Sequence, residues 1–393
     1  MNRHIVDAEV QKFILYHLND DPAGIALQKS PFSEVSSAEL ASQVDGKKRS
    51  QKKLPLWHAT PGIYFPPRLN MEQASSESTA HYKTALLKGN HIADLTGGFG
   101  VDSFYFARRA AQVYHIEQNE ELSDIAAHNA SVLGASNITF IKADSIGFLE
   151  TSNLSFDTAY LDPARRIESR KVFLLKDTVP DVTACLPLLL SKAPRIVIKT
   201  SPLFDIQSGL KELSQVSEVH VVSVKNDCKE LLWVIDKGFT GEPLITCAMT
   251  GPEGARTFSF YISHEKELQI RQFSDPLSYL YEPDVALMKA GGFRSIAEQY
   301  PVLKLNVNTH LYTSSEPFIQ FPGRIFKVKD VNAYSSFSKD SKTRIKANVI
   351  VRNFPLEAEQ VKKKQKISDG GELYLIFTTD QYGKLIVIEA ERI

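Results

Sequence analysis

The sequence predicts an α/β fold in which a mainly parallel, seven-stranded sheet lies between a helical N-terminal region and a small α+β C-terminal region. Short apolar runs alternate with helical patterns from about residue 90 to residue 200, as in strands joined by crossover helices. The last three strands are expected at residues 194–199, 216–225 and 230–236. The polar turn between the final two is too short for a helical crossover, so the terminal strand is antiparallel.

The sheet begins with a strand, a glycine loop and a helix. In the stretch IADLTGGFGVD, residues 92–102, an apolar run and an acidic residue precede Gly97, Gly98 and Gly100. A helical pattern then starts at Asp102. Glycines have no Cβ and can adopt positive φ, so a ligand can lie against the backbone there. The N–H groups at the start of the helix favour a carboxylate or phosphate beside them.

Acidic residues follow the next three strands, which are expected at residues 112–116, 138–141 and 158–161. They are Glu117, Asp144 and Asp162. The carboxyl ends of parallel strands meet at one edge of a sheet, and ligands bind in the crevice there. We therefore expect these side chains and the glycine loop to surround one ligand.

The composition is that of a globular protein. The 393 residues are 43% hydrophobic and 23% charged, with a formal net charge of zero, and can form two or three domains. Three cysteines are too few for a disulfide framework or a Cys-rich metal site and suit the cytosol. No apolar run has the length of a signal peptide or membrane span. We therefore expect a cytoplasmic protein without a metal.

Four regions are expected along the chain. They are a helical region with a proline-rich connector (1–70), the domain of the large sheet (71–240), an α+β region (241–322) and a final small module (323–393). One helix is expected within residues 71–87, capped by Ser75 or Ser76, and strands are expected over 256–262, 268–273 and 318–328. Basic residues cluster at 47–53, 165–171 and 362–366, so a neutral chain can still carry a basic face.

The strand ends and the glycine loop resemble those of class I S-adenosylmethionine-dependent methyltransferases, which have a Rossmann-like sheet of seven strands. The resemblance implies S-adenosylmethionine as the cofactor. The residues that it assigns to the cofactor are Asp94, Thr96, Gly97, Gly98, Gly100, Asp102, Glu117, Gln118, Asp144 and Asp162. Glu117 would accept the ribose hydroxyls, and Asp144 would reach the adenine amino group. Thr96 departs from the family, which has a glycine at that position.

A dinucleotide is the nearest competing ligand, since G-x-G-x-x-G loops occupy the same kind of turn. Ser103 stands where that motif has its third glycine or an alanine. The antiparallel terminal strand also favours the methyltransferase resemblance.

The segment DPARRIESRK, which begins at Asp162, indicates the reaction. Base-amino methyltransferases often have D/N-P-P-F/Y here, whereas this chain keeps Asp162 and Pro163 but continues with Ala164 and Arg165. Some uridine-C5 RNA methyltransferases have D-P-A-R and need a cysteine after the fifth strand. The corresponding segment IVIKTSPLFD has none. We therefore expect direct in-line methyl transfer, with Asp162, Pro163 and Arg165 as catalytic residues.

The tail resembles that of bacterial class I methyltransferases with C-terminal ferredoxin-like and THUMP-like domains. The motifs are YEPDVALMKAGGF and KANVIVRNFP, at residues 281–293 and 346–355. True THUMP domains present RNA to an active site, so the resemblance implies tRNA or rRNA as the substrate. The residues expected to bind the substrate are Tyr82, Arg165, Arg166, Lys199, Lys362, Lys363 and Lys364.

Two other interpretations stay open. The chain could methylate a protein or a small metabolite and use the tail for oligomerisation, or it could bind RNA without catalysis. The target nucleotide, the methylated atom and the oligomeric state do not follow from the sequence.

Overall fold

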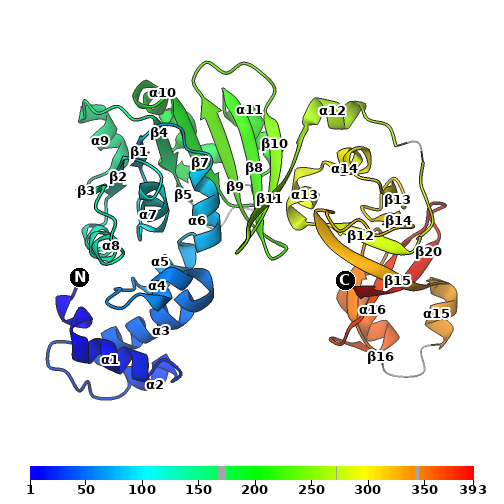
Figure 1. Cartoon of the computed structure of the whole chain (residues 1–393), viewed down its shortest axis with the longest axis horizontal. Coiled ribbons are helices and arrows are strands. Elements are labelled where there is room, and N and C mark those ends of the chain that lie inside the picture. Colours follow the sequence, from blue (N-terminus) through cyan, green and yellow to red (C-terminus); the bar gives the residue numbers. More distant parts are fainter. Residues whose placement is uncertain (166–173, 271, 341–344) are drawn as a thin grey trace. The chain divides into compact units, whose positions relative to one another are not determined.

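The computed structural model describes residues 1–165, 174–270, 272–340 and 345–393 (Figure 1). The chain divides into two compact units. The first contains residues 1–219, 230–241 and 250–254, and the second contains residues 220–229, 242–249 and 255–393.

The first unit begins with short helices. They are η1 (Arg3–Val6), α1 (Ala8–Tyr16), α2 (Pro22–Ala26), α3 (Ser37–Lys53) and α4 (Pro55–Ala59). Ser36 caps α3 in a capping box with Glu39, an arrangement that satisfies two amides that lack helical partners. The apolar side of α1, with Val10 and Ile14, packs into a core that also contains Trp57 and Phe104. The N-terminal helices therefore pack against the helix that follows the glycine loop.

Two lysines of the basic run at residues 47–53 stabilise the packing of these helices through hydrogen bonds to carbonyl groups. Lys47 is buried, and its ammonium group donates to the carbonyl of His58 at 2.8 Å. Lys53 donates to the carbonyls of Met71 and Glu72 at 2.8 and 2.7 Å. Only part of this run is therefore free to form a basic face.

The helix expected within residues 71–87 is present as α6 (Glu77–Thr84), and Ser76, one of its two predicted caps, accepts the amide of Thr79. A separate helix, α5 (Arg68–Gln73), precedes it and ends before an extended Ala74. A serine side chain that takes a backbone amide competes with continuation of a helix, so a new helix starts there.

The predicted fold class is confirmed. The strands that were expected are β1 (His91–Asp94), β2 (Gln112–Glu117), β3 (Ile138–Lys142), β4 (Thr158–Leu161), β7 (Arg195–Thr200), β8 (Val216–Val224) and β9 (Asp227–Asp236). Their order is β3-β2-β1-β4-β7-β9-β8, with β7 and β9 antiparallel. The turn between β8 and β9 consists of Lys225 and Asn226, both with positive φ, as tight hairpins require.

The large sheet continues beyond the expected seven strands. Within the described residues it has nine, because β10 (Leu244–Gly251) and β11 (Gly254–Tyr261) pair beyond β8. Strands β1, β4 and β7 are buried along nearly their whole length, as in a sheet covered on both faces. The connecting helices are α7 (Val101–Ala107), α8 (Glu120–Val132), α9 (Ser145–Thr151), α10 (Val182–Lys192) and α11 (Ile206–Glu212).

A small ribbon follows β4. It pairs β5 (Ala164–Arg165) with β6 (Thr178–Val179), and η2 (Leu175–Asp177) precedes β6. Arg166 and most of the basic run at 165–171 lie outside the described residues, and the same holds for the side chain of Arg165.

The second unit contains a second sheet, with strand order β13-β14-β12-β15-β20-β19-β17. Its strands are β12 (Tyr279–Pro283), β13 (Leu303–Lys304), β14 (Tyr312–Ser314), β15 (Gly323–Ala333), β17 (Asn348–Val351), β19 (Leu373–Thr379) and β20 (Leu385–Arg392). Short strands β16 (Ile345–Lys346) and β18 (Ile367–Ser368) pair separately. The helices are α12 (Ile262–Glu267), α13 (Val285–Ala290), α14 (Phe293–Gln299), α15 (Tyr334–Asp340) and α16 (Ala358–Gln365).

Two strand predictions in the tail need correction. The described part of 268–273 contains no strand, and only Phe273 makes an isolated bridge, to Lys304. The strand expected at 318–328 begins at Gly323, because the proline before it has no amide to give to a sheet.

The two tail motifs meet at a buried carboxylate. Glu282 of the first motif is 1% exposed, and its Oε1 accepts from Nη2 of Arg352 of the second motif at 2.6 Å. Arg324 of β15 pairs with the other oxygen. A buried carboxylate with two arginine partners links β12, β15 and the end of β17.

Removing this carboxylate should destabilise the second unit. Glu282→Ala leaves two partly buried arginines without their counter-charge, which typically costs about 3–5 kcal/mol. We expect faster amide hydrogen exchange in peptides covering residues 279–283 and 348–351, measured by mass spectrometry. Glu391→Ala is the control, because Glu391 forms an exposed pair with Lys329. Equal exchange in the two variants would contradict the role given to Glu282.

Candidate functional site

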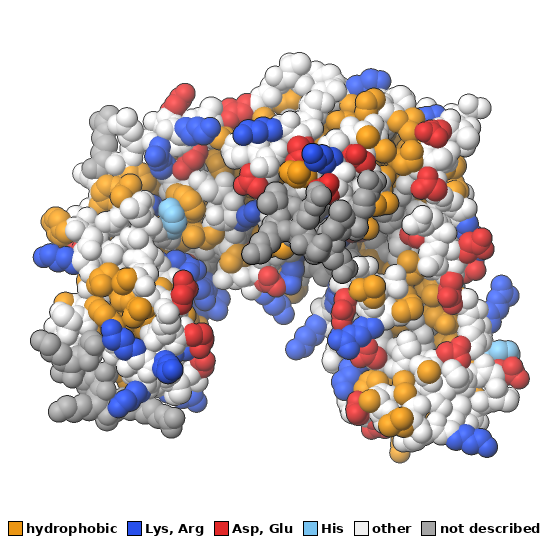
Figure 2. Space-filling view, turned by 180° about the vertical axis from the view of Figure 1, so that it is seen from behind, with side chains coloured by type: hydrophobic (Ala, Val, Ile, Leu, Met, Phe, Trp, Pro, Cys, Tyr) orange, Lys and Arg blue, Asp and Glu red, His pale blue; other side chains and the backbone are white. Residues whose placement is uncertain are grey.

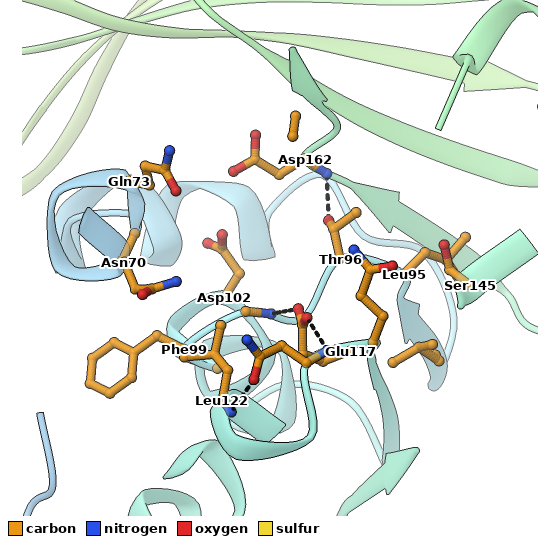
Figure 3. A pocket seen from close by; sticks show the side chains of 18 of the residues that line it. Asn70, Gln73, Leu95, Thr96, Phe99, Asp102, Glu117, Leu122, Ser145 and Asp162 are labelled. Carbon is orange, nitrogen blue, oxygen red and sulfur yellow. Dashed lines mark hydrogen bonds between the residues drawn. The ribbon is translucent and has the colours of Figure 1, made fainter. Parts of the chain in front are cut away.

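One cavity of about 480 Å³ lies at the carboxyl ends of the first strands of the large sheet (Figure 3). Nine of the residues predicted for the site line it: Thr96, Gly97, Gly98, Gly100, Asp102, Glu117, Gln118, Asp144 and Asp162. The structure therefore brings the glycine loop and the three acidic strand ends together. Lining residues that the sequence did not single out include Asn70, Phe99, Asn119, Leu122, Ser145, Val179 and Pro180.

The glycine loop needs its glycines for close packing. A Cβ on Gly97 would lie 2.3 Å from the ring of His115, and one on Gly100 would lie 2.9 Å from the Cβ of Ala126. Gly98 and Gly100 also have positive φ, which favours glycine. The loop amides are already used: Gly97 donates to the carbonyl of Ile116, and Gly100 to that of Gly97. The loop therefore presents a fixed backbone surface to the cavity.

Glu117 is held by two backbone amides. Its Oε2 accepts from Gly98 and its Oε1 from Asn119, both at 2.8 Å (Figure 3). Each carboxylate oxygen has a second lone pair, and Glu117 lines the cavity. The carboxylate is thus fixed in orientation and can still accept two hydroxyl groups of a ligand.

Asp94 lies beneath the loop and does not line the cavity. It is 1% exposed, accepts from the hydroxyl of Ser103 at 2.6 Å and accepts the amide of Thr96 at 3.3 Å. Burial raises the pKa of Asp94 to about 7, against the effect of the Ser103 hydrogen bond. Through these two hydrogen bonds, Asp94 stabilises the glycine loop.

His115 packs under the same loop. Its Nδ1 lies 3.0 Å from the hydroxyl of Ser103, and burial lowers the pKa of the imidazole to about 3. A neutral ring therefore fills the space that Gly97 leaves.

Thr96 stands where the loop of the family has a glycine, and its side chain forms a hydrogen bond. Its hydroxyl accepts the amide of Asp162 at 2.6 Å (Figure 3). The side chain thus joins the glycine loop to the end of β4. A glycine at this position could not make that bond.

Asp162 reaches the cavity beside Lys199. The register of β4 and β7 pairs Leu161 with Ile198, so the next residues of the two strands are neighbours. The ammonium group of Lys199 is ion-paired with Oδ2 of Asp162. Burial favours the neutral lysine, but the carboxylates of Asp162, Glu230 and Asp102 outweigh it and raise the pKa of Lys199.

Asp102 also lines the cavity, in the first turn of α7. It accepts from the hydroxyls of Ser75 and Tyr160 at 2.7 and 3.1 Å, and from the ammonium group of Lys83 at 2.8 Å. Burial would raise the pKa of Asp102, but Lys83 and Lys199 outweigh it and the pKa is lowered. Lys83 gave no signal in the sequence, because it is a lysine in a polar helix.

Asp144 lines the cavity and also caps α9. Its Oδ2 accepts the amide of Gly147 at 2.8 Å. The capping bond fixes the side chain and leaves the other carboxylate oxygen to face a ligand.

Several predicted substrate-binding residues are not at this cavity. Tyr82 and Lys199 do not line it. Lys362, Lys363 and Lys364 belong to α16 in the second unit. Lys362 pairs with Glu359 and Asp369, and the ammonium group of Lys364 lies 5.4 Å from the ring centroid of Tyr334. Figure 2 shows Lys and Arg side chains interspersed with Asp and Glu on the face it presents.

The described residues contain no group of three or more His, Cys, Asp or Glu that could hold a metal ion. None of their helices is long and apolar enough to cross a membrane.

The tail of the chain matches two known domain families, and the whole chain matches a solved structure. A family described as a ferredoxin-like domain matches residues 279–322, and one described as THUMP domain-like matches residues 323–392. A crystal structure from Porphyromonas gingivalis W83, named "putative methyltransferase", is 30% identical. The match covers 98% of this chain and 97% of that one, with a TM-score of 0.87.

Two more matches cover part of the chain. "Uncharacterized RNA methyltransferase MMOB5020" of Mycoplasma mobile is 29% identical over 133 residues, which are 33% of this chain and 36% of the relative. The chain thus spans about a third of that relative's length. A Streptococcus mutans structure, named a "putative methyltransferase" in complex with SAH, matches 40% of this chain and 95% of that one, with 15% identity and a TM-score of 0.30.

The pH dependence of stability should reveal the buried Asp94. Because its pKa is raised from 3.8 to about 7, the unfolded chain loses this proton first, and stability falls as pH rises from about 4 to about 7. Asp94→Asn removes this pH-dependent contribution to stability. The asparagine can keep both hydrogen bonds. The free energy of unfolding of the variant relative to the native protein should rise by roughly 2 kcal/mol between pH 5 and pH 7.

Urea denaturation at several pH values measures this difference. Asp227→Asn is the control, since Asp227 is 67% exposed, and its difference from the native protein should not change with pH. A constant difference for Asp94→Asn would show that Asp94 is ionised in the folded protein throughout this range.

Proposed function

The chain belongs to the family of the Porphyromonas gingivalis protein named "putative methyltransferase", and its tail has ferredoxin-like and THUMP-like domains; on this premise we propose that it transfers a methyl group from S-adenosylmethionine to RNA. The observation that carries the proposal is the cavity, where the glycine loop and three acidic strand ends come together. Such a set of groups suits a ligand that combines a ribose, an adenine and an amino acid.

The residues of the cavity fit S-adenosylmethionine. Its volume of about 480 Å³ lies within the range of roughly 300–1,000 Å³ of small-molecule sites. Glu117 would accept the ribose hydroxyls with the lone pairs that the backbone leaves available. Asp144 would accept from the adenine amino group, and Asp102 would hold the ammonium group. Apolar side chains of Leu95, Phe99, Ile116 and Leu122 line the same space and would contact the adenine.

Asp162 is the proposed catalytic residue. S-adenosylmethionine supplies a methyl group made electrophilic by its sulfonium, so alignment of the acceptor provides most of the catalysis. With Oδ2 paired to Lys199, Asp162 would use Oδ1 to hold the acceptor or take its proton. Cys185, Cys228 and Cys247 do not line the cavity, in keeping with a mechanism without a cysteine nucleophile. Pro163 and Arg165 remain predictions.

RNA is the favoured substrate because of the tail. The THUMP domain-like match and the name of the Mycoplasma relative support it. The exposed lysines Lys346, Lys363 and Lys366 could contact phosphates. A protein or metabolite substrate remains the second candidate, and an RNA-binding protein without catalysis the third.

Asp162→Ala should separate binding from turnover. We expect methyl transfer to fall at least about 100-fold, while the dissociation constant for S-adenosylhomocysteine changes less than about threefold, because Asp162 acts on the acceptor. Transfer of labelled methyl to RNA and isothermal titration calorimetry measure the two quantities. Glu117→Ala is the contrasting variant and should weaken binding, since two charge-assisted hydrogen bonds are lost. Equal loss of binding in both variants would make Asp162 structural.

RNA binding should depend on salt. If the lysines of the second unit contact phosphates, the affinity for total RNA should fall steeply between 50 and 200 mM salt as counterions are released. Filter binding at several salt concentrations measures this slope. Lys346→Ala combined with Lys363→Ala should reduce the slope, and Lys29→Ala, an exposed lysine of the first unit, should not. Methyl transfer without RNA binding would favour the second candidate.

A further inference from the structure

Five charged side chains, most of them largely buried, form a cluster next to the cavity. They are Lys83, Asp102, Asp162, Lys199 and Glu230, all in the first unit. Lys83 is fully buried, with Nζ 2.8 Å from Oδ1 of Asp102 and 3.4 Å from Oε2 of Glu230. Lys199 is 13% exposed and paired with Asp162. Asp102 and Asp162 line the cavity, whereas the other three do not.

Each lysine holds one of the two cavity carboxylates. Lys83 is fixed from several sides, because it also donates to the hydroxyl of Ser75 at 2.6 Å and lies 5.6 Å from the ring centroid of Tyr160. Ser75 and Tyr160 in turn donate to Asp102. Three groups therefore hydrogen-bond Asp102, and Lys83 is the charged one. Lys199 also acts on Asp102 electrostatically, but its ion pair is with Asp162.

Glu230 is the partner that the two lysines share. It lies in β9, is 2% exposed, and interacts electrostatically with both Lys83 and Lys199. Its Oε1 has no hydrogen-bond partner among the described residues. Burial raises the pKa of Glu230 against the attraction of the two lysines. Three carboxyl groups face two lysines: Asp102 and Asp162 balance the two ammonium charges, and the raised pKa of Glu230 favours its neutral form, which keeps the cluster from carrying an excess negative charge.

The cost of burying these charges points to a function. Each ion taken from water costs several kcal/mol, and a buried ion pair returns no net stability compared with apolar residues of similar volume. Clusters of this kind occur preferentially at functional sites. The ammonium groups of both lysines already have carboxylate partners, so neither lysine is needed to contact a ligand directly.

We propose that Lys83 and Lys199 are positioning residues with separate tasks: Lys83 fixes Asp102 for binding of the methyl donor, Lys199 fixes Asp162 for the acceptor, and Glu230 is the carboxyl group that interacts with both lysines. This rests on the proposed function, because it assigns donor and acceptor to the two carboxylates that line the cavity. It also changes the expected role of Lys199, from contacting the substrate to orienting the residue that does.

Donor binding tests the division between the two lysines. The dissociation constant for S-adenosylhomocysteine is measured by calorimetry on full-length Lys83→Met and Lys199→Met. We expect at least a tenfold weaker affinity for Lys83→Met and a change below threefold for Lys199→Met. Lys88→Met is the matched control, because Lys88 forms an ion pair with Asp236 but is 63% exposed. Its affinity should equal that of the native protein.

If Lys83→Met does not fold, a second pair of variants tests whether the position of Asp102 matters for donor binding. Ser75→Ala removes one donor to Asp102 without removing a charge, and should weaken the affinity three- to tenfold. In an Asp102→Asn background, Ser75→Ala should have little further effect, since both act through the same side chain. Additive losses would overturn the positioning role. Thermal unfolding of every variant identifies those that lose structure.

Turnover tests the acceptor side. Lys199→Met should lower methyl transfer to RNA at saturating donor at least 30-fold, and should have no further effect in Asp162→Ala.

If the native protein does not bind S-adenosylhomocysteine, the proposed function fails and the positioning roles fail with it. If it binds but Lys83→Met and Lys199→Met lose affinity equally, only the positioning roles fail. If it binds but transfers nothing to RNA, the acceptor is not RNA, and the binding comparison still decides the role of Lys83.

Discussion

The site depends on hydrogen bonds between the glycine loop and the residues at the ends of three strands. Asp94 accepts the amide of Thr96, Glu117 accepts that of Gly98, and the hydroxyl of Thr96 accepts the amide of Asp162. These bonds join three strand ends to one loop. A loop of glycines has high conformational entropy when free, so this network determines its shape before any ligand arrives.

The charges around the cavity are paired within the protein. A low local dielectric strengthens each pair and makes any unpaired member costly. Asp102 and Asp162 each have a lysine partner, and Glu117 has two amides. A site with such pairs reorganises little when a ligand binds. Where a reaction needs alignment more than proton transfer, this preorganisation is the main source of catalysis.

Basic residues in the sequence do not by themselves identify side chains that are free to bind RNA. Arg352 lies in a motif that could contact phosphates, yet it pairs with the buried Glu282. Lys47 and Lys53 likewise donate to carbonyl groups of nearby helices. Basic residues are therefore weak evidence for RNA until their partners are known. The domain family of the tail and the lysines that remain exposed are what support RNA as the proposed substrate.

Seven strands of the large sheet and the glycine loop could be predicted from the sequence, because both follow from local patterns. Apolar runs, the short turn before β9 and three glycines near one acidic residue need no knowledge of distant residues. The helix with its serine cap was also predicted locally, whereas the separate helix at 68–73 and the two further strands of the large sheet were not, and the strand expected near 270 was wrong, since pairing with distant strands decides which segments join a sheet. Only the tertiary structure could assign partners: Lys83, Glu230 and Lys199 lie far apart in the chain, and their roles depend on which carboxylates the fold buries beside them.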